Sequence, residues 1–408
     1  MAVVRPFRAL RPEPHVAAAV AAVPYDVVST DEARALVENA PLNFLHVTRA
    51  EIGLPPHLDA HGAAVYDAAR ANLVRLRDAA PLVVEDEPAL YVYRLRDGDH
   101  EQVGVAGCFS LDEYDTGVIK RHERTRPEKE DDRTRHMVAI KAQTGLVFLT
   151  YRQVPAIASL IAQICQTQPL FDFEAADGVG HTVWRASADH TCRLADGFAI
   201  VPAVYIADGH HRVASAARAR RELNAEVDDS VAEAAHDLFV AVAFPDEQTR
   251  ILPYNRTVSD LAGATAAQFL KRLSDRVPVE PTDATSPSKG ATSMYLAGRW
   301  YRVDLSGDGA ARDPVSALDV SLLQDHVLGP FLNVTDVRTD PRIGFVGGIR
   351  GAATLERLVD SGAAAVAFSM AAVTVAELLA IADTGEIMPP KSTWFEPKVR
   401  DGLLVHLL

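Results

Sequence analysis

The sequence predicts a protein of the mixed α/β class, that is, an α/β fold with α+β character. Short apolar runs bounded by turn residues alternate with segments that have the 3.6-residue period of amphipathic helices. Two strand pairs are joined by hairpin signals, at Asp97-Gly98 and at Ala297-Gly298. A chain of 408 residues with 48% apolar and 24% charged residues is also long enough to bury the cores of two or three domains.

The N-terminal part is predicted to contain two helices, two short extended segments and a hairpin. The residues Ser29–Glu32 have the spacing of a capping box, which predicts a helix to about Asn39. A longer helix is predicted from about Ala60 to Asp78, because apolar residues recur on one helical face. The extended segments are predicted at Pro24–Val28 and Asn43–Thr48, and the first hairpin pairs Leu90–Leu95 with Gln102–Phe109.

The rest of the chain alternates between predicted strands and helices. In chain order we expect a strand at Leu146–Tyr151, a helix at Ala156–Thr167, strands at Thr182–Arg185 and Asp237–Phe244, a helix that begins at Ser259, a hairpin of Met294–Leu296 with Trp300–Leu305, a helix at 320–331, a strand at 343–346, a helix at 353–361, a strand at 364–368 and a helix at 373–383. Residues 283–293 are rich in Ser, Thr, Pro and Gly, which predicts a linker. We therefore expect an N-terminal α/β part at 1–105, a core at 106–282 and a C-terminal α/β part at 294–408.

The stretch Tyr205–Ala217 predicts a strand that turns sharply into a helix. Residues 203–207 are apolar, Asp208-Gly209 is a turn, and from Val213 onward strong helix formers follow. A helix start attracts anions through its unpaired backbone N–H groups and its dipole. This elbow therefore predicts an anion site. The alternative is a plain turn in which Asp208 caps the helix and the neighbouring His and Arg side chains are solvated.

Two further polar segments are candidates for chemistry. Residues Ile119–Arg133 are dense in both charge signs, as in a solvated helix face, but they also suit phosphoryl transfer. In that case the Lys and Arg side chains would hold phosphates, and Glu123 or Asp132 would take a proton or hold Mg²⁺. The segment Pro389–Lys398 combines two of the chain's seven lysines with hydroxyls and aromatics, or else packs on the body through its aromatics. The glycine-rich run 347–351 is a weak further candidate for approaching an anion.

Composition excludes several classes of function. A net charge of −14 disfavours a nucleic-acid surface or attraction to anionic lipid. The three cysteines lack CxxC spacing, which fits a reduced cytoplasmic protein without a disulfide framework. No secretory h-region or membrane-spanning run is visible. The scans for G-x-G-x-x-G, Walker A, H-E-x-x-H and G-x-S-x-G motifs are also negative.

Four motifs together resemble the DUF1015 family. They are Tyr205-Ile206-Ala207-Asp208-Gly209-His210-His211-Arg212, Pro24-Tyr25-Asp26-Val27-Val28, Lys120-Arg121-His122-Glu123-Arg124-Thr125 and Pro389-Pro390-Lys391-Ser392-Thr393-Trp394-Phe395-Glu396-Pro397-Lys398. These motifs are distributed from near the N-terminus to the C-terminus, so the resemblance covers almost the whole chain.

The run Asp208–Arg212 is also similar to the D-G-H-T-R box of free-serine kinases with the ParB/sulfiredoxin-like fold, with His211 in place of Thr. This resemblance implies a ParB/sulfiredoxin-like nucleotide-binding core within 106–282. It implies that Glu123 is the base that deprotonates the serine hydroxyl and that Asp208 orients the substrate or Mg²⁺. It also implies that Gly209, His210 and Arg212 hold nucleotide phosphates. The sulfiredoxin box is similar as well, but its catalytic Cys is replaced by His210, which argues against sulfinic-acid reduction.

The sequence thus predicts a nucleotide-dependent small-molecule kinase that phosphorylates free L-serine, with ATP or ADP and Mg²⁺ as cofactors. The catalytic residues would be Glu123 and Asp208. The predicted phosphate contacts are Gly209, His210, His211, Arg212, Lys120 and His122, with Lys129, Arg133, Lys391 and Lys398 as further substrate or phosphate contacts. The alternatives are a non-catalytic nucleotide-binding regulatory protein, which would bind without turnover, and a phosphate-ester hydrolase, which would release phosphate without nucleotide. A metal site made by His210, His211 and Asp208 is disfavoured, because adjacent residues rarely point at one ion. We expect an amino acid and a nucleotide as partners, and no nucleic acid or membrane.

Overall fold

A computed structural model describes residues 1–224, 234–307 and 313–408. The chain forms two compact units. The first contains Met1–Arg121, Thr125–Thr249 and Pro397–Leu408, and the second contains His122–Arg124 and Arg250–Glu396. These units do not coincide with the predicted parts 1–105, 106–282 and 294–408. The predicted linker at 283–293 lies inside the second unit and runs into one of its strands, because a Ser- and Pro-rich run can equally join two strands of one sheet.

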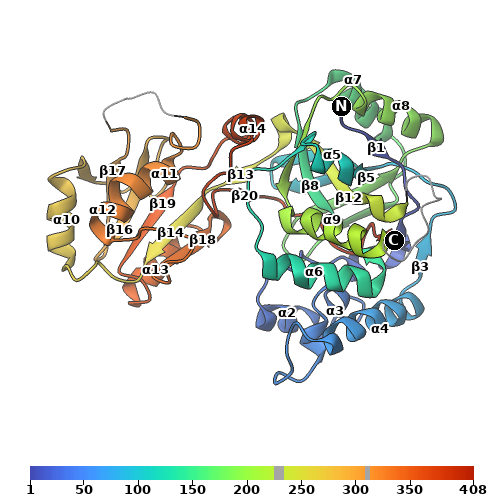
Figure 1. The fold of residues 1–408 in the computed structure, drawn as a ribbon, viewed down its shortest axis with the longest axis horizontal. Helices are drawn as coiled ribbons and strands as arrows, with labels where there is room; N and C mark the ends of the chain where they lie inside the picture. The colour runs from blue at the N-terminus through green and yellow to red at the C-terminus, as the bar shows by residue number, and fades with distance from the viewer. Residues whose placement is uncertain (225–233, 308–312) are drawn as a thin grey trace. The chain divides into compact units, whose positions relative to one another are not determined.

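The first unit is built on a mixed nine-stranded sheet (Figure 1). In sheet order its strands are β6 (Ile119–Lys120), β11 (Val204–Asp208), β8 (Val147–Tyr151), β12 (Leu238–Pro245), β5 (His100–Ser110), β4 (Tyr91–Asp97), β10 (Gly180–Arg185) and β9 (Phe171–Glu174), with β1 (Val4–Arg5) paired to β5. The pairs β6–β11 and β8–β12 are parallel, and the other neighbours are antiparallel. The predicted mixed α/β class is confirmed.

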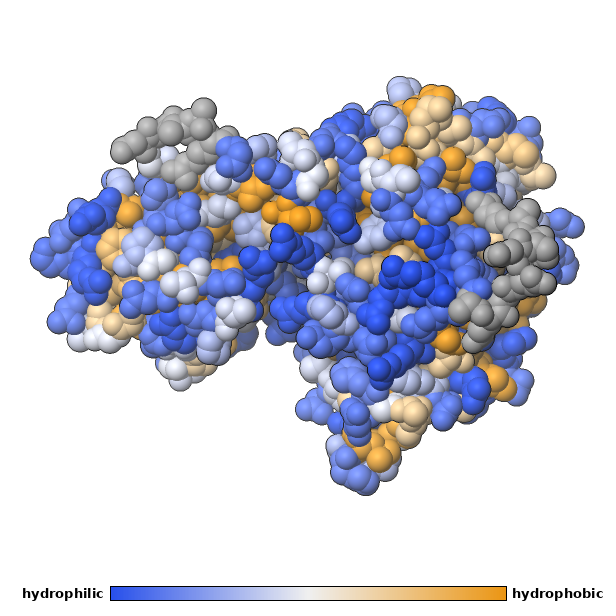
Figure 2. Space-filling view, viewed as in Figure 1, coloured by the Kyte–Doolittle hydropathy of each residue, from blue (hydrophilic) through white to orange (hydrophobic). Residues whose placement is uncertain are grey.

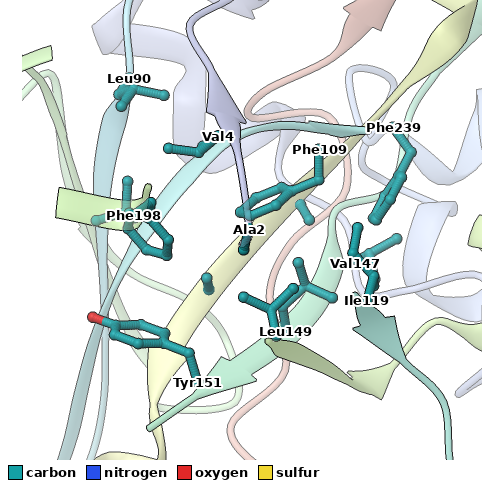
Figure 3. Close-up of a cluster of buried hydrophobic side chains, with 14 of the residues drawn as sticks. Ala2, Val4, Leu90, Phe109, Ile119, Val147, Leu149, Tyr151, Phe198 and Phe239 are labelled. Atoms are coloured by element: carbon teal, nitrogen blue, oxygen red, sulfur yellow. The ribbon is translucent and has the colours of Figure 1, made fainter. Parts of the chain in front are cut away.

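Helices surround this sheet and close the core. The long helices are α4 (Ala63–Ala79), α6 (Pro127–Ile140), α7 (Pro155–Ile164), α8 (Ala188–Phe198) and α9 (His210–Asn224). α6 packs on both α9 and α4, and α7 packs on α8. Figure 3 shows Phe109, Phe198 and Phe239 pointing into one buried cluster. The rings of Phe109 and Phe198 meet edge to face with centroids 6.3 Å apart, the geometry that aromatic pairs prefer.

Shorter elements complete the first unit. They are β2 (Leu10–Pro12) paired with β3 (Leu82–Val84), β7 (Ala142–Gln143) paired with β21 (His406–Leu407), and the helices α1 (Ala17–Val20), α2 (Thr30–Val37), α3 (Leu45–Thr48) and α5 (Leu111–Asp115). Through β21 the last residues of the chain return to the first unit, far in sequence from the strands they join. This return positions two residues of the candidate site.

The second unit has an antiparallel six-stranded sheet with helices against it (Figure 1). In sheet order its strands are β15 (Val279–Pro281), β17 (Arg299–Asp304), β16 (Ala291–Leu296), β19 (Val366–Met370), β14 (Tyr254–Val258) and β18 (Ile343–Gly347). Its helices are α10 (Ala266–Ser274), α11 (Asp319–Leu323), α12 (Gly329–Leu332), α13 (Ala352–Asp360) and α14 (Val375–Thr384), and β13 (Ile251–Leu252) pairs with β20 (Trp394–Phe395).

Most predicted elements are confirmed, and three are wrong. The capping box is present, with both Ser29 and Glu32 bonded as predicted. Residues 43–48, predicted as a strand, form the helix α3, because the Asn43 side chain accepts the Leu45 N–H and starts a helical turn. Pro24–Val28 is a turn and bend rather than an extended segment. Ser259 begins no helix, since its N–H bonds to the Arg342 carbonyl and the next helix, α10, starts after a capping box at Thr265.

None of the helices in the described ranges has the length and apolar character that a membrane crossing requires. In the view of Figure 2, the surface over α6 and α9 is mostly hydrophilic.

Candidate functional site

The predicted elbow is present in the first unit, where β11 ends at Asp208 and α9 begins at His210. Gly209 joins them with φ of +98°, a backbone conformation that side chains disfavour. Its carbonyl accepts the N–H groups of Arg212 and Val213, so it is the first acceptor of the helix. The helix therefore begins three residues before the predicted Val213. The sequence around the elbow folds as predicted because Gly209 permits the turn and the alanines that follow favour the helix.

Asp208, at the end of β11, is held in an ion pair. The Lys398 ammonium lies 2.8 Å from its Oδ2 atom, and both side chains are mostly buried. Burial alone would raise the pKa of Asp208, but Lys398 and then Arg212 hold that pKa well below its usual range. Asp208 is therefore a carboxylate throughout the neutral pH range. Lys398 was predicted to contact substrate or phosphate, and its partner in the structure is Asp208.

The two histidines of the elbow occupy the first turn of α9. His210 is buried, whereas His211 is partly exposed. The backbone N–H of Arg126, just before α6, donates to His211 Nε2 at 3.0 Å. Burial and then Lys129 lower the pKa of His211, so its imidazole is neutral and accepts this bond. The charged segment before α6 is thereby fixed against the elbow.

Arg212 points away from solvent, and its guanidinium is only partly satisfied. Its Nη1 donates to the Leu146 carbonyl at 2.6 Å, and its Nη2 lies 3.2 Å from Asp26 Oδ1. The guanidinium also lies 5.6 Å from the centre of the Tyr25 ring. The remaining nitrogen, Nε, is buried without a hydrogen-bond partner in the described part of the chain. Burial lowers the pKa of Arg212, but Asp26, Asp401 and Asp208 outweigh it and keep the group charged.

A buried polar network holds the returning C-terminal segment in place. The Arg400 Nε donates to His181 Nε2 at 3.1 Å, and the other nitrogen of His181 lies 2.9 Å from the Tyr93 hydroxyl. Arg400 also pairs with Asp177. Burial, aided by Arg400, lowers the pKa of His181 to about 3, so the ring stays neutral and accepts the arginine. The residues on either side of Arg400, including Lys398, are positioned by this network.

Asp401 is the second residue that the returning segment delivers. It is 1% exposed, and neither carboxylate oxygen has a hydrogen-bond partner among the described residues, although the Tyr25 backbone approaches closely enough to lower its pKa. Burial has the largest effect and raises the pKa of Asp401 to about 7, with a smaller contribution from Asp26. The lowering effects of Arg212, Arg133 and the Tyr25 backbone are outweighed. Buried carboxylates that lack partners are rare and usually have a functional or hydration-related cause.

This raised pKa predicts an unusual pH dependence of stability. Because the ordinary pKa is about 3.9, the folded protein holds the proton of Asp401 more tightly than the unfolded chain does. Its stability should therefore fall as the pH rises from about 4 to about 7. Asp401→Asn should be more stable than the wild type at pH 8, by up to about 4 kcal/mol, because about three pKa units correspond to about 1.4 kcal/mol each.

Urea unfolding from pH 5 to pH 8 measures this difference between the wild type and Asp401→Asn. The gap should already be about 1.5 kcal/mol at pH 5, about one pH unit above the ordinary pKa of Asp, and should widen to about 4 kcal/mol near pH 8. A constant gap over that range would show that the carboxyl does not ionise with a raised pKa.

The other predicted site residues divide between the units. Lys120 lies in the first unit, where β6 pairs with β11 and its ammonium lies 6.0 Å from the Tyr205 ring centre. Lys129 and Arg133 are on α6, and Arg133 bonds Asp132 and the Thr48 carbonyl rather than solvent. The predicted residues His122, Glu123 and Lys391 belong to the second unit. There His122 accepts the Met388 N–H through its carbonyl, and Lys391 lies 5.4 Å from the Tyr254 ring centre.

Three residues beside Arg212 were not predicted as site residues, namely Tyr25, Asp26 and Asp401. The first two belong to the Pro24–Val28 motif, where an aromatic and an acid adjoin a proline. For Asp401 the signal was an acid that comes two residues before the apolar run 403–405.

A protein-family model described as "Protein of unknown function (DUF1015)" matches residues 4–321. No curated protein matches the chain. Among solved structures, a conserved hypothetical protein from Pyrococcus furiosus is 14% identical, with 74% of this chain and 95% of that chain covered and a TM-score of 0.34. A free serine kinase in complex with AMP is 12% identical, with 72% and 91% covered and a TM-score of 0.35. SbnI with a C-terminal truncation from Staphylococcus aureus is 13% identical, with 74% and 87% covered and a TM-score of 0.40.

Proposed function

The chain belongs to the DUF1015 family, and we propose that it is a nucleotide-dependent kinase of a small hydroxyl compound. The proposed substrate is free L-serine and the product O-phosphoserine. The observation that carries this proposal is the β11–α9 elbow. It places a helix start, a neutral His211 and an ionised Asp208 at one point of the first unit.

The elbow suits the phosphate chain of ATP or ADP. The start of α9 presents backbone N–H groups and the positive end of a helix dipole, and Gly209 keeps the approach free of a side chain. We assign Gly209, His210 and His211 to phosphate binding, as the sequence predicts. Lys120 and Lys129 supply positive charge from β6 and α6, the elements beside the elbow. Phosphoryl transfer needs mostly such positioning and neutralisation of charge.

The proposed base is Glu123, in the loop that joins β6 to α6. Both ends of this loop are fixed beside the elbow within the first unit. Lys120 pairs with Tyr205 of β11, and Arg126 donates its N–H to His211. Because β6 and β11 are parallel, their carboxyl ends meet at the same sheet edge. This anchoring supports the role of Glu123, and that of His122 as a phosphate contact.

The proposed reaction is a single transfer. Glu123 takes the proton of the serine hydroxyl as the serine Oγ forms a bond to the terminal phosphorus of the nucleotide. The bond from that phosphorus to the bridging oxygen breaks, and the shortened nucleotide leaves with that oxygen. Asp208 orients the substrate, and Lys398 fixes the position of its carboxylate.

Mg²⁺ is proposed to enter with the nucleotide phosphates, since this ion usually binds substrate phosphates plus one or two carboxylates. Asp208 would contact the ion through one carboxylate oxygen, directly or through a water molecule. Its Oδ2 is occupied by Lys398, so only Oδ1 is left for a water or an ion. In this role the ion would neutralise charge on the transferred phosphoryl group.

The test is a reaction of the purified full-length protein with Mg²⁺, L-serine and either ATP or ADP. O-phosphoserine, measured by mass spectrometry, should form in proportion to enzyme, and it should disappear when EDTA is added. Saturable nucleotide binding with no phosphoserine would contradict the kinase and favour a regulatory nucleotide-binding protein. Release of phosphate from phosphoserine without nucleotide would favour a hydrolase.

A further inference from the structure

The helix α6 is held at its start by a side chain from another helix. Its N-cap residue is Arg126, whose own side chain forms no capping hydrogen bond among the described residues. The next residue, Pro127, has no backbone N–H to offer. The Arg126 N–H donates to His211 Nε2 at 3.0 Å, across 85 positions of sequence. One imidazole in the first turn of α9 therefore fixes the beginning of α6 within the first unit.

This hydrogen bond requires a neutral imidazole. A neutral histidine has one N–H and one acceptor nitrogen, whereas both ring nitrogens of the protonated form are donors. Because Nε2 of His211 accepts the Arg126 N–H, the neutral ring carries its proton on Nδ1. Protonation of Nε2 would set two N–H donors against each other. The charge of His211 therefore decides whether the start of α6 is held.

The surroundings of His211 disfavour the charged ring as long as the bond is kept. Burial has the largest effect and lowers the pKa of His211, and the positive charges of Lys129 and Arg126 lower it further. The carboxylates of Asp26, on the turn before α2, and of Glu130, on α6, oppose this shift but do not outweigh it. The ring also lies beside the N-terminal ends of α6 and α9, where the helix dipoles are positive. Movement of the α6 start away from the ring would remove part of this repulsion, so protonation and release favour each other.

We propose that His211 is a pH-sensitive latch, which holds the start of α6 when the ring is neutral and releases it when the ring is protonated. The released segment leads back from Arg126 to Lys120, which stays paired with β11. This segment contains Glu123, the proposed base, so its release lowers turnover in mildly acidic solution. That effect on turnover rests on the proposed function, whereas the latch rests on the bond between His211 and Arg126.

The direction of the pH dependence follows from the lowered pKa. An unrestrained histidine takes up its proton near pH 6.5, but His211 in the latched state takes it up only at lower pH. The latch therefore keeps its full strength above about pH 6.5 and weakens as the pH falls below that value.

The experiment is hydrogen exchange of the full-length protein, read by mass spectrometry in peptides that span Arg126. Exchange is followed from about pH 7.5 to about pH 4.5 and corrected for the pH dependence of exchange in an unfolded chain. We expect the corrected exchange at the start of α6 to rise at least about tenfold over this range, or about 1.4 kcal/mol, as the hydrogen bond is lost. Equal protection at every pH would overturn the latch.

Two variants assign this change to His211. His211→Gln offers a neutral amide that cannot take up a proton, so its exchange at the start of α6 should be independent of pH, whether or not the amide holds the Arg126 N–H. The control is His190→Gln, because His190 lies on α8 and its ring contacts Ser187. This control should keep the wild-type pH dependence. Asp401 also titrates in part of this range, but it is present in all three proteins. A wild-type pH dependence in His211→Gln would overturn the assignment.

The latch and the kinase can fail separately, because the exchange measurement needs neither substrate nor turnover. Release of the α6 start at low pH without formation of phosphoserine would support the latch and contradict the kinase. If phosphoserine is formed, wild-type turnover should fall over the same pH range in which the protection is lost. Turnover that stays constant while the α6 start is released would overturn the control of Glu123 by the latch.

Discussion

Replacement of Glu123 by Gln should lower the rate of phosphoserine formation by about 100- to 10,000-fold, the usual contribution of a general base. The amide keeps the size of the side chain and removes its ability to take a proton. Nucleotide affinity should stay within about twofold of the wild type, because the loss falls on the chemical step and not on binding. Single-turnover assays for the product and calorimetry for the nucleotide measure the two quantities.

The matched control for this variant is Glu128→Gln. Glu128 is an exposed residue in the first turn of α6, five residues further along the same charged segment. Its replacement should leave turnover within about twofold of the wild type, since a surface charge acts weakly at a distance. A similar loss in both variants, or none in Glu123→Gln, would remove Glu123 from its role as base.

Replacement of Lys398 by Met should destabilise the first unit by about 3 to 5 kcal/mol at pH 7, the range found when one partner of a buried ion pair is removed. The change leaves the Asp208 carboxylate mostly buried without its ammonium. The pair contributes this stability above about pH 4, where an unfolded Asp is ionised. The contribution is lost as the pH falls through the lower pKa that Asp208 has in the folded protein. Urea unfolding, followed by circular dichroism, measures the difference.

Two further variants test whether the ion pair itself causes this loss. The double variant Lys398→Met with Asp208→Asn should recover most of the lost stability, because no unpaired charge is then buried. Lys391→Met is the control, since Lys391 is exposed and contacts a tyrosine ring rather than a carboxylate. It should cost at most about 1 kcal/mol. Equal costs for the two lysine variants would contradict the proposed importance of the Asp208 ion pair.

The elements that the sequence predicted well carry their own local signals. The capping box at Ser29 and the glycine in the turn at Gly209 each fix a backbone conformation through residues that are neighbours in sequence. The elements predicted wrongly lack such signals. A run as short as Asn43–Thr48 has no period long enough to distinguish a strand from a helical turn, and one side-chain bond from Asn43 decided it.

The candidate site likewise has a part that local sequence signals predict and a part that depends on long-range contacts. The sequence alone determined the elbow, because a strand, a glycine turn and a helix start follow each other within about ten residues, and the chemistry of Asp208–Arg212 lies on that one stretch. Only the tertiary structure decided that Lys398 neutralises Asp208 and that Asp401 and Asp26 meet Arg212 around a cavity. Those contacts join residues more than 180 positions apart. The contacts of Lys398 and Asp401 depend on a C-terminal segment that returns to the first unit, and long-range pairing of this kind leaves no periodic or local mark in the amino-acid sequence.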